Sequence, residues 1–188
     1  MNPSVSTPAP ALAERYGPVA RALHWSMFLL IAAMCLAVEA RGWLPKESAT
    51  RASLMFFHKS CGVAVFALVW LRLAWRATHP APKLPAGPAW QHFAAHAGHV
   101  ALYLLMIGMP LTGYLTSAYA GRAVPFFGLF ELPLAVGPDE AIGHTVKEFH
   151  EAGATVLYVV VAVHIGAALW HHFVQKDTVL TRMLPQRG

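Results

Sequence analysis

The sequence predicts an all-α integral membrane protein, a bundle of four spanning helices. Hydrophobic residues make up 56% of the 188 residues and charged residues only 12%, with a mean hydropathy of +0.47. An ordinary soluble domain carries about 25% charged residues. Four apolar stretches approach the length of about 20 residues that crosses a bilayer. None of them alternates strictly between apolar and polar residues, and a backbone in lipid must satisfy its own hydrogen bonds, so helices are predicted rather than barrel strands.

The four predicted spans cover about residues 18–38, 54–75, 96–118 and 149–173. No small-residue cleavage site follows the first span, which makes it an anchor rather than a removed signal peptide. In the third span, Pro110 and Gly113 predict a kink. Cys35 and Cys61 lie within apolar runs and are expected to act as small hydrophobic residues. Together the spans form one membrane domain over residues 17–176.

The remaining segments are predicted connectors and tails. Residues 1–16 are rich in Pro, Ala, Ser and Thr and are expected to be disordered. Residues 177–188 are expected to form a short cytoplasmic tail. The Pro-rich stretch 78–90 is expected to be a semi-rigid linker. The longest connection, 119–148, contains "PFFGLFELPL", which is too short to span a membrane and is expected to lie at its interface.

Charge sets the expected orientation. An even number of spans puts both termini on one side, and that side carries eight of the fourteen Lys and Arg residues against six on the other. This excess favours cytoplasmic termini. Seven of the nine acidic residues fall on the opposite side, so the net charge of +5 belongs mainly to the inner face. Anionic lipid headgroups explain that charge, and nucleic acid is not needed as a partner.

Four histidines fall inside or at the ends of the predicted spans, in two pairs matched by depth. His24 lies about 9 Å into the first span from the inside, and His58 lies near the outer end of the second. In the fourth span, His150 lies at the outer end and His164 about 21 Å further in, on the same face of the helix. His58 and His150 are therefore paired outside, and His24 and His164 inside.

Two imidazoles that face each other between helices are suited to be the axial ligands of a b haem. The flat ring needs small or flat neighbours, and Gly62, Ala154, Ala168 and Phe28 each follow one of the four histidines by four residues. The sequence therefore predicts two haem b groups stacked across the membrane, about 20 Å apart between ligands. Haem propionates favour cations, and the candidates are Arg21, Arg72 and Arg76 inside and Arg51, Lys59, Arg122 or Lys147 outside.

The order of several motifs resembles that of a known family. The motifs are "RALHWSMFLL", "FFHKSCG", "LRLAWR", "HAGHVALYLL", "WHHF" and "KDTVLTRMLP". Together they are similar to the bacterial cytochrome b561 family of four-helix, di-haem inner-membrane proteins, over nearly the whole chain after the first 15 residues. The resemblance places the haem ligands on His24, His58, His150 and His164. It implies a quinone-linked electron carrier, with superoxide as a periplasmic one-electron donor and ubiquinone as the acceptor.

Three histidines near the start of the third span leave alternatives open. His92, His96 and His99 fall on one face at its inner end. They could compete with His24 as a haem ligand or line a quinone site. They could also lie among lipid headgroups, which is the interpretation we favour.

Two further groups of polar residues have alternative interpretations. His171 follows His164 by seven residues at the inner boundary and could relay a proton to quinone, or be an ordinary interfacial residue. On the outer side, Lys59, Arg51 and Arg122 could draw an anion toward the outer haem by electrostatic focusing. A solvated surface is the alternative for these cations.

Two other functions are compatible with the pattern. One is a haem b membrane-anchor subunit of a dehydrogenase or hydrogenase, which could use a similar bis-histidine core. The other is a proton or metal-ion transporter with a ladder of histidines, which would be colourless. The sequence specifies neither a catalytic residue nor a protein partner or homo-oligomeric state.

Overall fold

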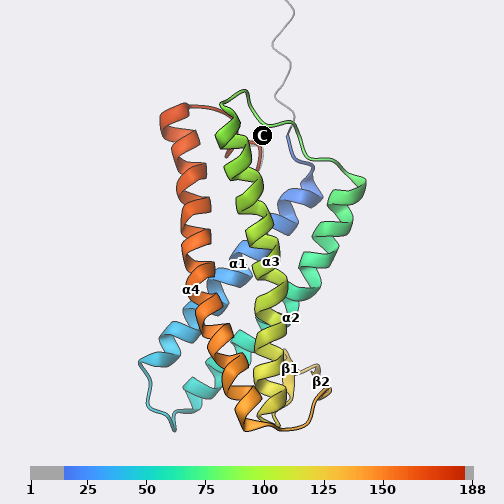
Figure 1. Ribbon diagram of the computed structural model, residues 1–188, viewed down its shortest axis with the longest axis vertical. Helices are drawn as coiled ribbons and strands as arrows, with labels where there is room; N and C mark the ends of the chain where they lie inside the picture. The colour runs from blue at the N-terminus through green and yellow to red at the C-terminus, as the bar shows by residue number, and fades with distance from the viewer. Residues whose placement is uncertain (1–14, 185–188) are drawn as a thin grey trace, which may run out of the picture.

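The computed structural model describes residues 15–184 as four long helices and one small β-hairpin (Figure 1). Each helix is long and apolar enough to cross a membrane, so the predicted all-α membrane bundle is confirmed. The expected disorder of residues 1–16 falls almost entirely outside the described residues, as does the end of the predicted tail 177–188. The elements are α1 (Pro18–Gly42), α2 (Ala49–Thr78), α3 (Ala89–Tyr119), β1 (Val124–Phe126), β2 (Phe130–Leu132), α4 (Glu140–Trp170) and a π-helical turn (His171–Gln175).

Local sequence signals mark several helix ends. α1 begins at Pro18, where the missing N–H and the fixed φ angle of proline suit the first turn. Asp139 caps α4, because its Oδ1 accepts a hydrogen bond from the backbone N–H of Ile142 at 2.9 Å. α3 continues as one helix through Pro110. The helices extend past the apolar stretches used to predict them, because their polar ends add turns beyond the hydrocarbon region.

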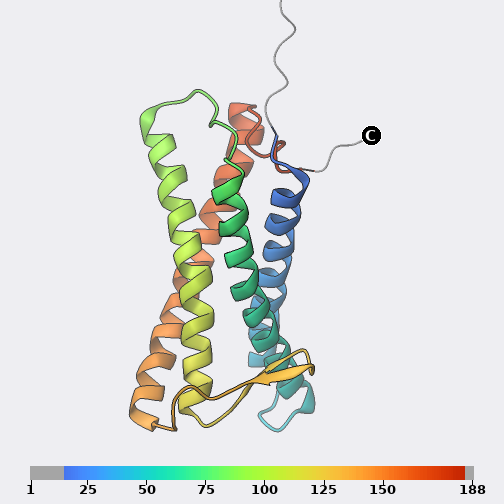
Figure 2. The same ribbon diagram turned by 90° about the vertical axis from the view of Figure 1, so that its right-hand side faces the viewer.

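The bundle consists of two helical hairpins, α1 with α2 and α3 with α4, which meet through α2 and α3 (Figure 2). Within the described residues, no Cα atom of α4 comes within 8 Å of α1 or α2. Helices in direct contact have axes about 8–10 Å apart. α4 therefore packs on α3 and stands off from the two other helices.

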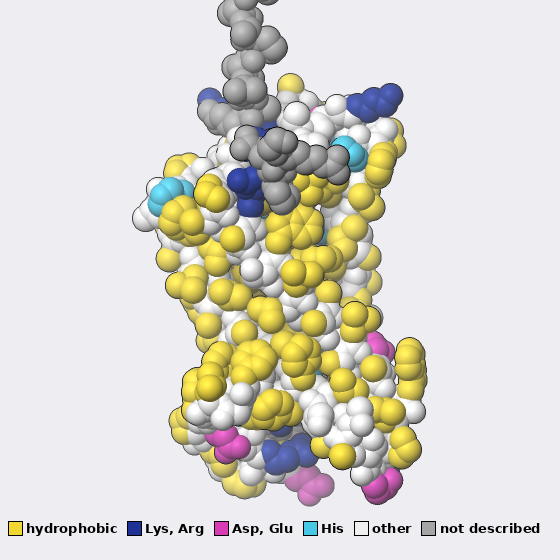
Figure 3. Space-filling model, turned by 180° about the vertical axis from the view of Figure 1, so that it is seen from behind, with side chains coloured by type: hydrophobic (Ala, Val, Ile, Leu, Met, Phe, Trp, Pro, Cys, Tyr) yellow, Lys and Arg dark blue, Asp and Glu magenta, His cyan; other side chains and the backbone are white. Residues whose placement is uncertain are grey.

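A buried core joins α1 and α2. It consists of Met27, Met34, Cys61, Val65 and Val69, each at most 7% exposed. Cys61 and the half-buried Cys35 are both free thiols, as expected of small hydrophobic residues. Most remaining apolar side chains point outward and cover the middle of the molecule, while acidic side chains gather toward the end away from the termini (Figure 3).

The segment "PFFGLFELPL" forms the β-hairpin, a structure that the sequence analysis did not predict. β1 and β2 pair antiparallel, with Phe126 opposite Phe130. The hairpin packs on α2, where Ser60 is fully buried. The Oγ of Ser60 donates to the carbonyl of Pro125 at 3.1 Å and accepts from the N–H of Phe127 at 3.0 Å. One buried hydroxyl thus holds both sides of the turn.

Two sets of contacts join α1 to the C-terminal half of the chain. Near the middle of α4, the hydroxyl of Tyr158 donates to Oε1 of Glu39 at 2.9 Å. At the end that holds both termini, residues 176–184 form a strap that lies against the start of α1 (Figure 2). Trp25 Nε1 donates to the carbonyl of Met183 at 2.9 Å. Both ends of the described chain therefore lie on one side, as an even number of spans requires.

Replacing Ser60 with Ala should loosen the hairpin, because the part-buried carbonyl of Pro125 and N–H of Phe127 would lose their common partner. The expected loss of stability is about 1–3 kcal/mol. Thermal unfolding of the purified protein in detergent and limited proteolysis within residues 121–135 would measure it. Ser53→Ala is the matched control on α2, since Ser53 is exposed and bonds only to Ala49 of its own helix. Equal unfolding temperatures and cleavage rates for the two variants would contradict this role.

Candidate functional site

The structure brings the four spanning histidines together in the two predicted pairs. The ring centres of His24 on α1 and His164 on α4 are 6.2 Å apart. Those of His58 on α2 and His150 on α4 are 6.4 Å apart. All four side chains are half-buried. α4 thus contributes one ring to each pair, and the helices from which it stands off contribute the other rings.

These separations suit a metal held between two imidazoles. A metal–nitrogen bond of about 2.0 Å on each side, with about 1.15 Å from each nitrogen to its ring centre, places the two centres about 6.3 Å apart. The observed 6.2 and 6.4 Å match this value. The b haem predicted from the sequence therefore fits the donor set of both pairs.

Hydrogen bonds orient the outer pair. Nδ1–H of His58 donates to the carbonyl of Met34 at 2.9 Å. Nδ1 of His150 lies 3.0 Å from Oγ1 of Thr112, whose own hydroxyl proton is directed at carbonyls of α3. The hydroxyl oxygen therefore accepts from Nδ1–H of His150. With both Nδ1 atoms engaged, the Nε2 atoms are left to bind a metal.

Small residues leave room around the outer pair. A Cβ atom added at Gly62, one turn after His58, would meet no atom within 4 Å, so the space beside this ring is open. At Gly113 the opposite holds, because a Cβ atom there would lie 3.0 Å from Cε1 of His150. Glycine at position 113 therefore lets the His150 ring lie directly against α3.

The inner pair is connected to a cation. Nη1 of Arg72 donates to Nδ1 of His24 at 3.2 Å, and Nε of Arg72 donates to the hydroxyl of Tyr103 at 3.1 Å. The charge of Arg72 also acts on His99 and His164. This arginine therefore links α1, α2 and α3 at the level of the inner pair.

A third histidine belongs to the inner site. The ring centre of His99 lies 5.6 Å from that of His164, and its Nδ1–H donates to the carbonyl of Ala95 at 2.7 Å. His92 and His96, in contrast, are exposed. The interpretation that all three lie among headgroups is therefore wrong for His99. Its position keeps open the alternative that it competes with His24 as a ligand.

A pocket beside the inner pair brings two of the predicted propionate contacts together. Its lining includes Arg72 and Arg76 from α2, together with Tyr16, Trp75 and Tyr103. Two cations and several aromatic hydrogen-bonding groups suit a carboxylate. Arg21, the third inner candidate, donates instead to the carbonyl of Leu184 in the strap at 2.9 Å.

Positive charge gathers around the outer pair. Arg41 and Lys59 act electrostatically on His58, and Arg122 acts on both of those cations. Arg51 lies close to Arg41 and donates to two carbonyls at the end of α1. We call Arg41, Arg51, Lys59 and Arg122 the outer cation cluster.

Lys147, another predicted propionate contact on the outer side, pairs with an acidic residue of its own helix instead. Its Nζ pairs with Oε1 of Glu151, 3.1 Å away. Both side chains are more than half exposed, so this pair is a solvated contact along α4. The carboxylate of Glu151 therefore offsets the charge of Lys147.

An apolar layer separates the two histidine pairs. Leu157 lies seven residues from both His150 and His164 and is the buried residue of α4, at 4% exposure. It lines a small cavity with Met34, Met109 and other apolar side chains of α1, α2 and α3. The two sites are therefore distinct and lie on opposite sides of a hydrophobic midplane.

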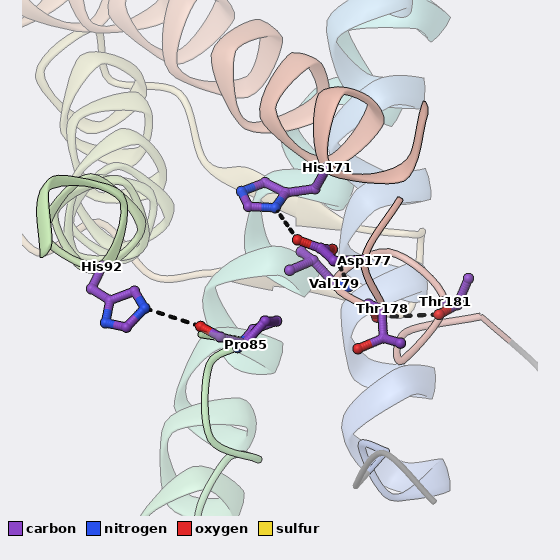
Figure 4. A network of polar contacts seen from close by, with 7 residues as sticks. All are labelled: Pro85, His92, His171, Asp177, Thr178, Val179 and Thr181. Atoms are coloured by element: carbon purple, nitrogen blue, oxygen red, sulfur yellow. Dashed lines mark hydrogen bonds and ion pairs between the residues drawn. The ribbon is translucent and has the colours of Figure 1, made fainter. Parts of the chain in front are cut away.

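His171 lies at the inner end of α4, where the helix changes to the π-helical turn. Its Nδ1 forms a hydrogen bond with Oδ2 of Asp177 (Figure 4). The sequence pattern predicts a role for His171 but gives no sign of Asp177, Thr112, Tyr103 or Arg41. Asp177 and Arg41 are ordinary polar residues at the ends of spans, and no local pattern distinguishes Thr112 or Tyr103.

Comparisons with known proteins find similar sequences over nearly the whole chain. A profile of the family described as prokaryotic cytochrome b561 matches residues 15–186. Cytochrome b561 homolog 1 of Escherichia coli (strain K12) is 39% identical over 166 residues, covering 88% of this chain and 94% of that protein. The probable superoxide oxidase CybB of Yersinia pestis is 31% identical over 175 residues, covering 93% and 98%. Cytochrome b561 homolog 2 of Escherichia coli (strain K12) is 34% identical over 179 residues, covering 91% and 92%.

Replacing Thr112 with Val should weaken binding of the haem that the sequence predicts at the outer pair, because Nδ1–H of His150 would lose the hydroxyl oxygen that orients it. Loss of such an orienting partner typically lowers metal affinity by about 10–100-fold. Haem content per chain and redox titration of the purified protein would measure the effect. Thr116→Val is the matched control, since its hydroxyl bonds only to the carbonyl of Thr112. If both variants kept full haem content and the same midpoint potentials, Thr112 would not orient the ligand.

Proposed function

Because the chain belongs to the prokaryotic cytochrome b561 family, a family of haem b membrane electron-transfer proteins, we propose that it carries electrons across the bacterial inner membrane from a periplasmic one-electron donor to ubiquinone. Superoxide is the proposed donor, since the relative from Yersinia pestis is named a probable superoxide oxidase. The observation that carries the proposal is the placement of two imidazole pairs, one toward each end of the spanning part of α4.

The four histidines are the proposed axial ligands of two haem b groups. His58 and His150 hold the outer group, and His24 and His164 hold the inner one. Haem iron supplies the one-electron chemistry by changing between its ferric and ferrous forms. At the outer pair the protein's part is to keep both Nε2 atoms available, through the Nδ1–H bonds of His58 to Met34 and of His150 to Thr112.

Arg72 has a further part in this proposal. Its guanidinium donates to Nδ1 of His24, so that nitrogen carries no proton in this arrangement. An imidazole that binds iron through Nε2 carries its proton on Nδ1 instead. Ligation by His24 therefore requires Arg72 to release Nδ1, which frees the guanidinium to pair with a propionate in the pocket that it shares with Arg76.

The outer cation cluster supports an anionic donor. Superoxide carries one negative charge, and a group of like charges at the mouth of a site raises the local concentration of an oppositely charged substrate. Two of the four cations, Arg41 and Lys59, act directly on His58, and the cluster draws on α1, α2 and the segment before β1. The gathering of cations from several segments supports electrostatic focusing of superoxide as the role of Lys59, Arg51 and Arg122, in preference to a solvated surface with no such role.

The proposed orientation has both termini in the cytoplasm. The excess of Lys and Arg near the termini supports it. The same orientation puts the outer cation cluster in the periplasm and His99, His171 and the Arg72 pocket near the inner boundary. We propose that ubiquinone binds on that side, with His171 and His99 as the candidate contacts.

Replacing His164 with Ala should remove the inner haem and leave the outer one, because α4 supplies only this ligand to the inner pair. The reduced-minus-oxidised spectrum of the purified protein should lose about half of its b-type signal per chain. His144→Ala is the matched control, since His144 is an exposed residue of the same helix. A full spectrum in His164→Ala would remove this residue from the ligand set, and a colourless wild-type protein would overturn the whole proposal.

Separate substitutions identify the partner of His164. If His24 is the ligand, His24→Ala loses the inner haem and His99→Ala keeps it. The reverse result would assign the inner site to His99. Both side chains are half-buried near His164, so the same spectrum of each variant is a direct comparison.

Neutralising the outer cation cluster should slow the reaction with superoxide. The double variant Lys59→Gln, Arg122→Gln is expected to lower the second-order rate constant by about tenfold at low ionic strength, with the difference shrinking as salt is added. Stopped-flow reduction of the haem absorbance measures this rate constant. Lys46→Gln, at an exposed position outside the cluster, is the control. An unchanged rate constant with the same salt dependence would exclude focusing by these residues.

A further inference from the structure

Two arginines converge on one backbone oxygen at the end of the bundle that holds both termini. Arg15, just before α1, donates to the carbonyl of Leu184 in the strap at 3.3 Å, and Arg21, in the first turn of α1, donates to the same carbonyl at 2.9 Å. Arg15 also donates to the carbonyl of Thr181 at 2.6 Å. We call Arg15 and Arg21 the arginine pair. Its two positive charges lie side by side against the strap.

The arginine pair has no acidic partner within the described part of the chain. None of the ion pairs formed there includes Arg15 or Arg21. Asp177 is the acidic residue that the structure describes at this end, and its carboxylate oxygens are bound by His171 and by the backbone N–H of Val179. A backbone carbonyl accepts a hydrogen bond but has no net charge, so the strap neutralises neither arginine.

Partial burial makes an unpaired charge more costly here. Nε of Arg21 is shielded from solvent and has no hydrogen-bond acceptor among the described residues. The same holds for Nε of Arg182 in the strap, whose Nη1 donates to the carbonyl of Lys83 at 2.6 Å. Arginines that lose water are nearly always paired with an anion, because an uncompensated charge away from water is unstable. The structure therefore points to an anion from outside the described chain.

An aromatic residue places the arginine pair at a membrane surface. Arg21 lies at the edge of the apolar stretch of α1. Trp25 follows one turn further in, and its Nε1 donates to the carbonyl of Met183 in the strap at 2.9 Å. Tryptophan is enriched where the hydrocarbon region meets the headgroups. Figure 3 shows positively charged side chains at the surface of this end. The arginine pair therefore lies at the depth of the lipid phosphates.

The phosphate of a phospholipid is an anion that every bilayer supplies at this depth. A guanidinium binds phosphate oxygens through charge-assisted hydrogen bonds, and basic pockets between spanning helices bind the headgroups of anionic lipids. Phosphatidylcholine carries the same phosphate, but its own ammonium group offsets the negative charge. A site at which two cations converge therefore favours a lipid with net negative charge, such as phosphatidylglycerol.

We propose that the arginine pair binds the phosphodiester of one anionic phospholipid and that this lipid fastens the strap to the start of α1. Each guanidinium donates to a phosphate oxygen, and the carbonyl of Leu184 keeps the two guanidinium groups together. Because the strap supplies that carbonyl, a bound lipid stabilises the strap in its position. The site requires only the membrane and this end of the bundle, so it is independent of the proposed electron transfer.

Lipid binding to the full-length, haem-loaded protein tests the site. Native mass spectrometry with added dioleoylphosphatidylglycerol or dioleoylphosphatidylcholine measures the affinity for each lipid. The wild type should retain one phosphatidylglycerol in preference to phosphatidylcholine. The double variant Arg15→Gln, Arg21→Gln should bind it at least about tenfold more weakly, because each arginine loses a charged hydrogen bond. Arg15→Gln alone, at an exposed position outside α1, should weaken binding in the same direction.

A matched control removes two other charges at the same end. Lys83 and Lys176 are both exposed, and the double variant Lys83→Gln, Lys176→Gln should keep the affinity for phosphatidylglycerol within about twofold of wild type. If this control lost as much affinity as the arginine variant, binding would follow overall charge and the site would be wrong. Equal retention of the two lipids by the wild type would also overturn the proposal.

Limited proteolysis tests whether the lipid fastens the strap, using the wild type alone. Trypsin cleaves after Lys176 and Arg182, which lie in the strap. Cleavage there should be about tenfold slower in nanodiscs that contain phosphatidylglycerol at about ten times its Kd than in nanodiscs of phosphatidylcholine, because bound lipid lowers the population of the released strap. Inorganic phosphate added to phosphatidylcholine nanodiscs should give no protection. Protection by phosphate would identify a free anion as the ligand, and equal cleavage in both nanodiscs would show that lipid does not hold the strap; either result overturns the proposal.

Discussion

A polar ring in the hydrocarbon core of a membrane is stable only when other groups take up its hydrogen-bonding and ligating capacity. In this protein that constraint falls on α4, which carries His164 deep within its long apolar stretch and His150 just before that stretch begins. Each ring meets an imidazole from another helix at a separation that suits one metal atom. The rings of the outer pair are also held by hydrogen bonds from their Nδ1 atoms, of His58 to α1 and of His150 to α3.

The pairings require α4 to stand off from α1 and α2, so its position must be held from elsewhere. Small residues on the facing sides of α3 and α4 provide that hold. A Cβ atom at Gly153 would lie 2.6 Å from Sδ of Met109, and one at Gly143 would lie 3.1 Å from Cβ of Tyr119. α3 and α4 can therefore pack closely. The exposed hydrogen bond from Tyr158 to Glu39 then links α4 to α1.

The two ends of the bundle have different chemistry, which gives the proposed electron path a direction. Around His58 the charged groups are cations from several segments, which attract a small anion. Around His164 they are Arg72 and further histidines, followed by the His171–Asp177 pair at the boundary. A cationic end and an end lined by histidines are the two features on which the proposed entry of single electrons and reduction of a quinone rest. The apolar layer at Leu157 keeps the two regions apart.

Much of this arrangement follows from the sequence alone. Four helices, both termini on one side, and the pairing of His24 with His164 and of His58 with His150 depend on hydrophobic length and helical periodicity, and both can be read along the chain. The partners of those rings depend on which distant residues meet after packing. Thr112 reaches His150 across 38 positions, Arg72 reaches His24 across 48, and His99 joins the inner site although it shares a helix face with two exposed histidines. The β-hairpin is also a tertiary outcome, because the buried hydroxyl of Ser60 stabilises its turn from another helix. The sequence therefore determined the four spanning helices and the relative depth of the histidines along them, while only the packed bundle decided which side chains orient the rings.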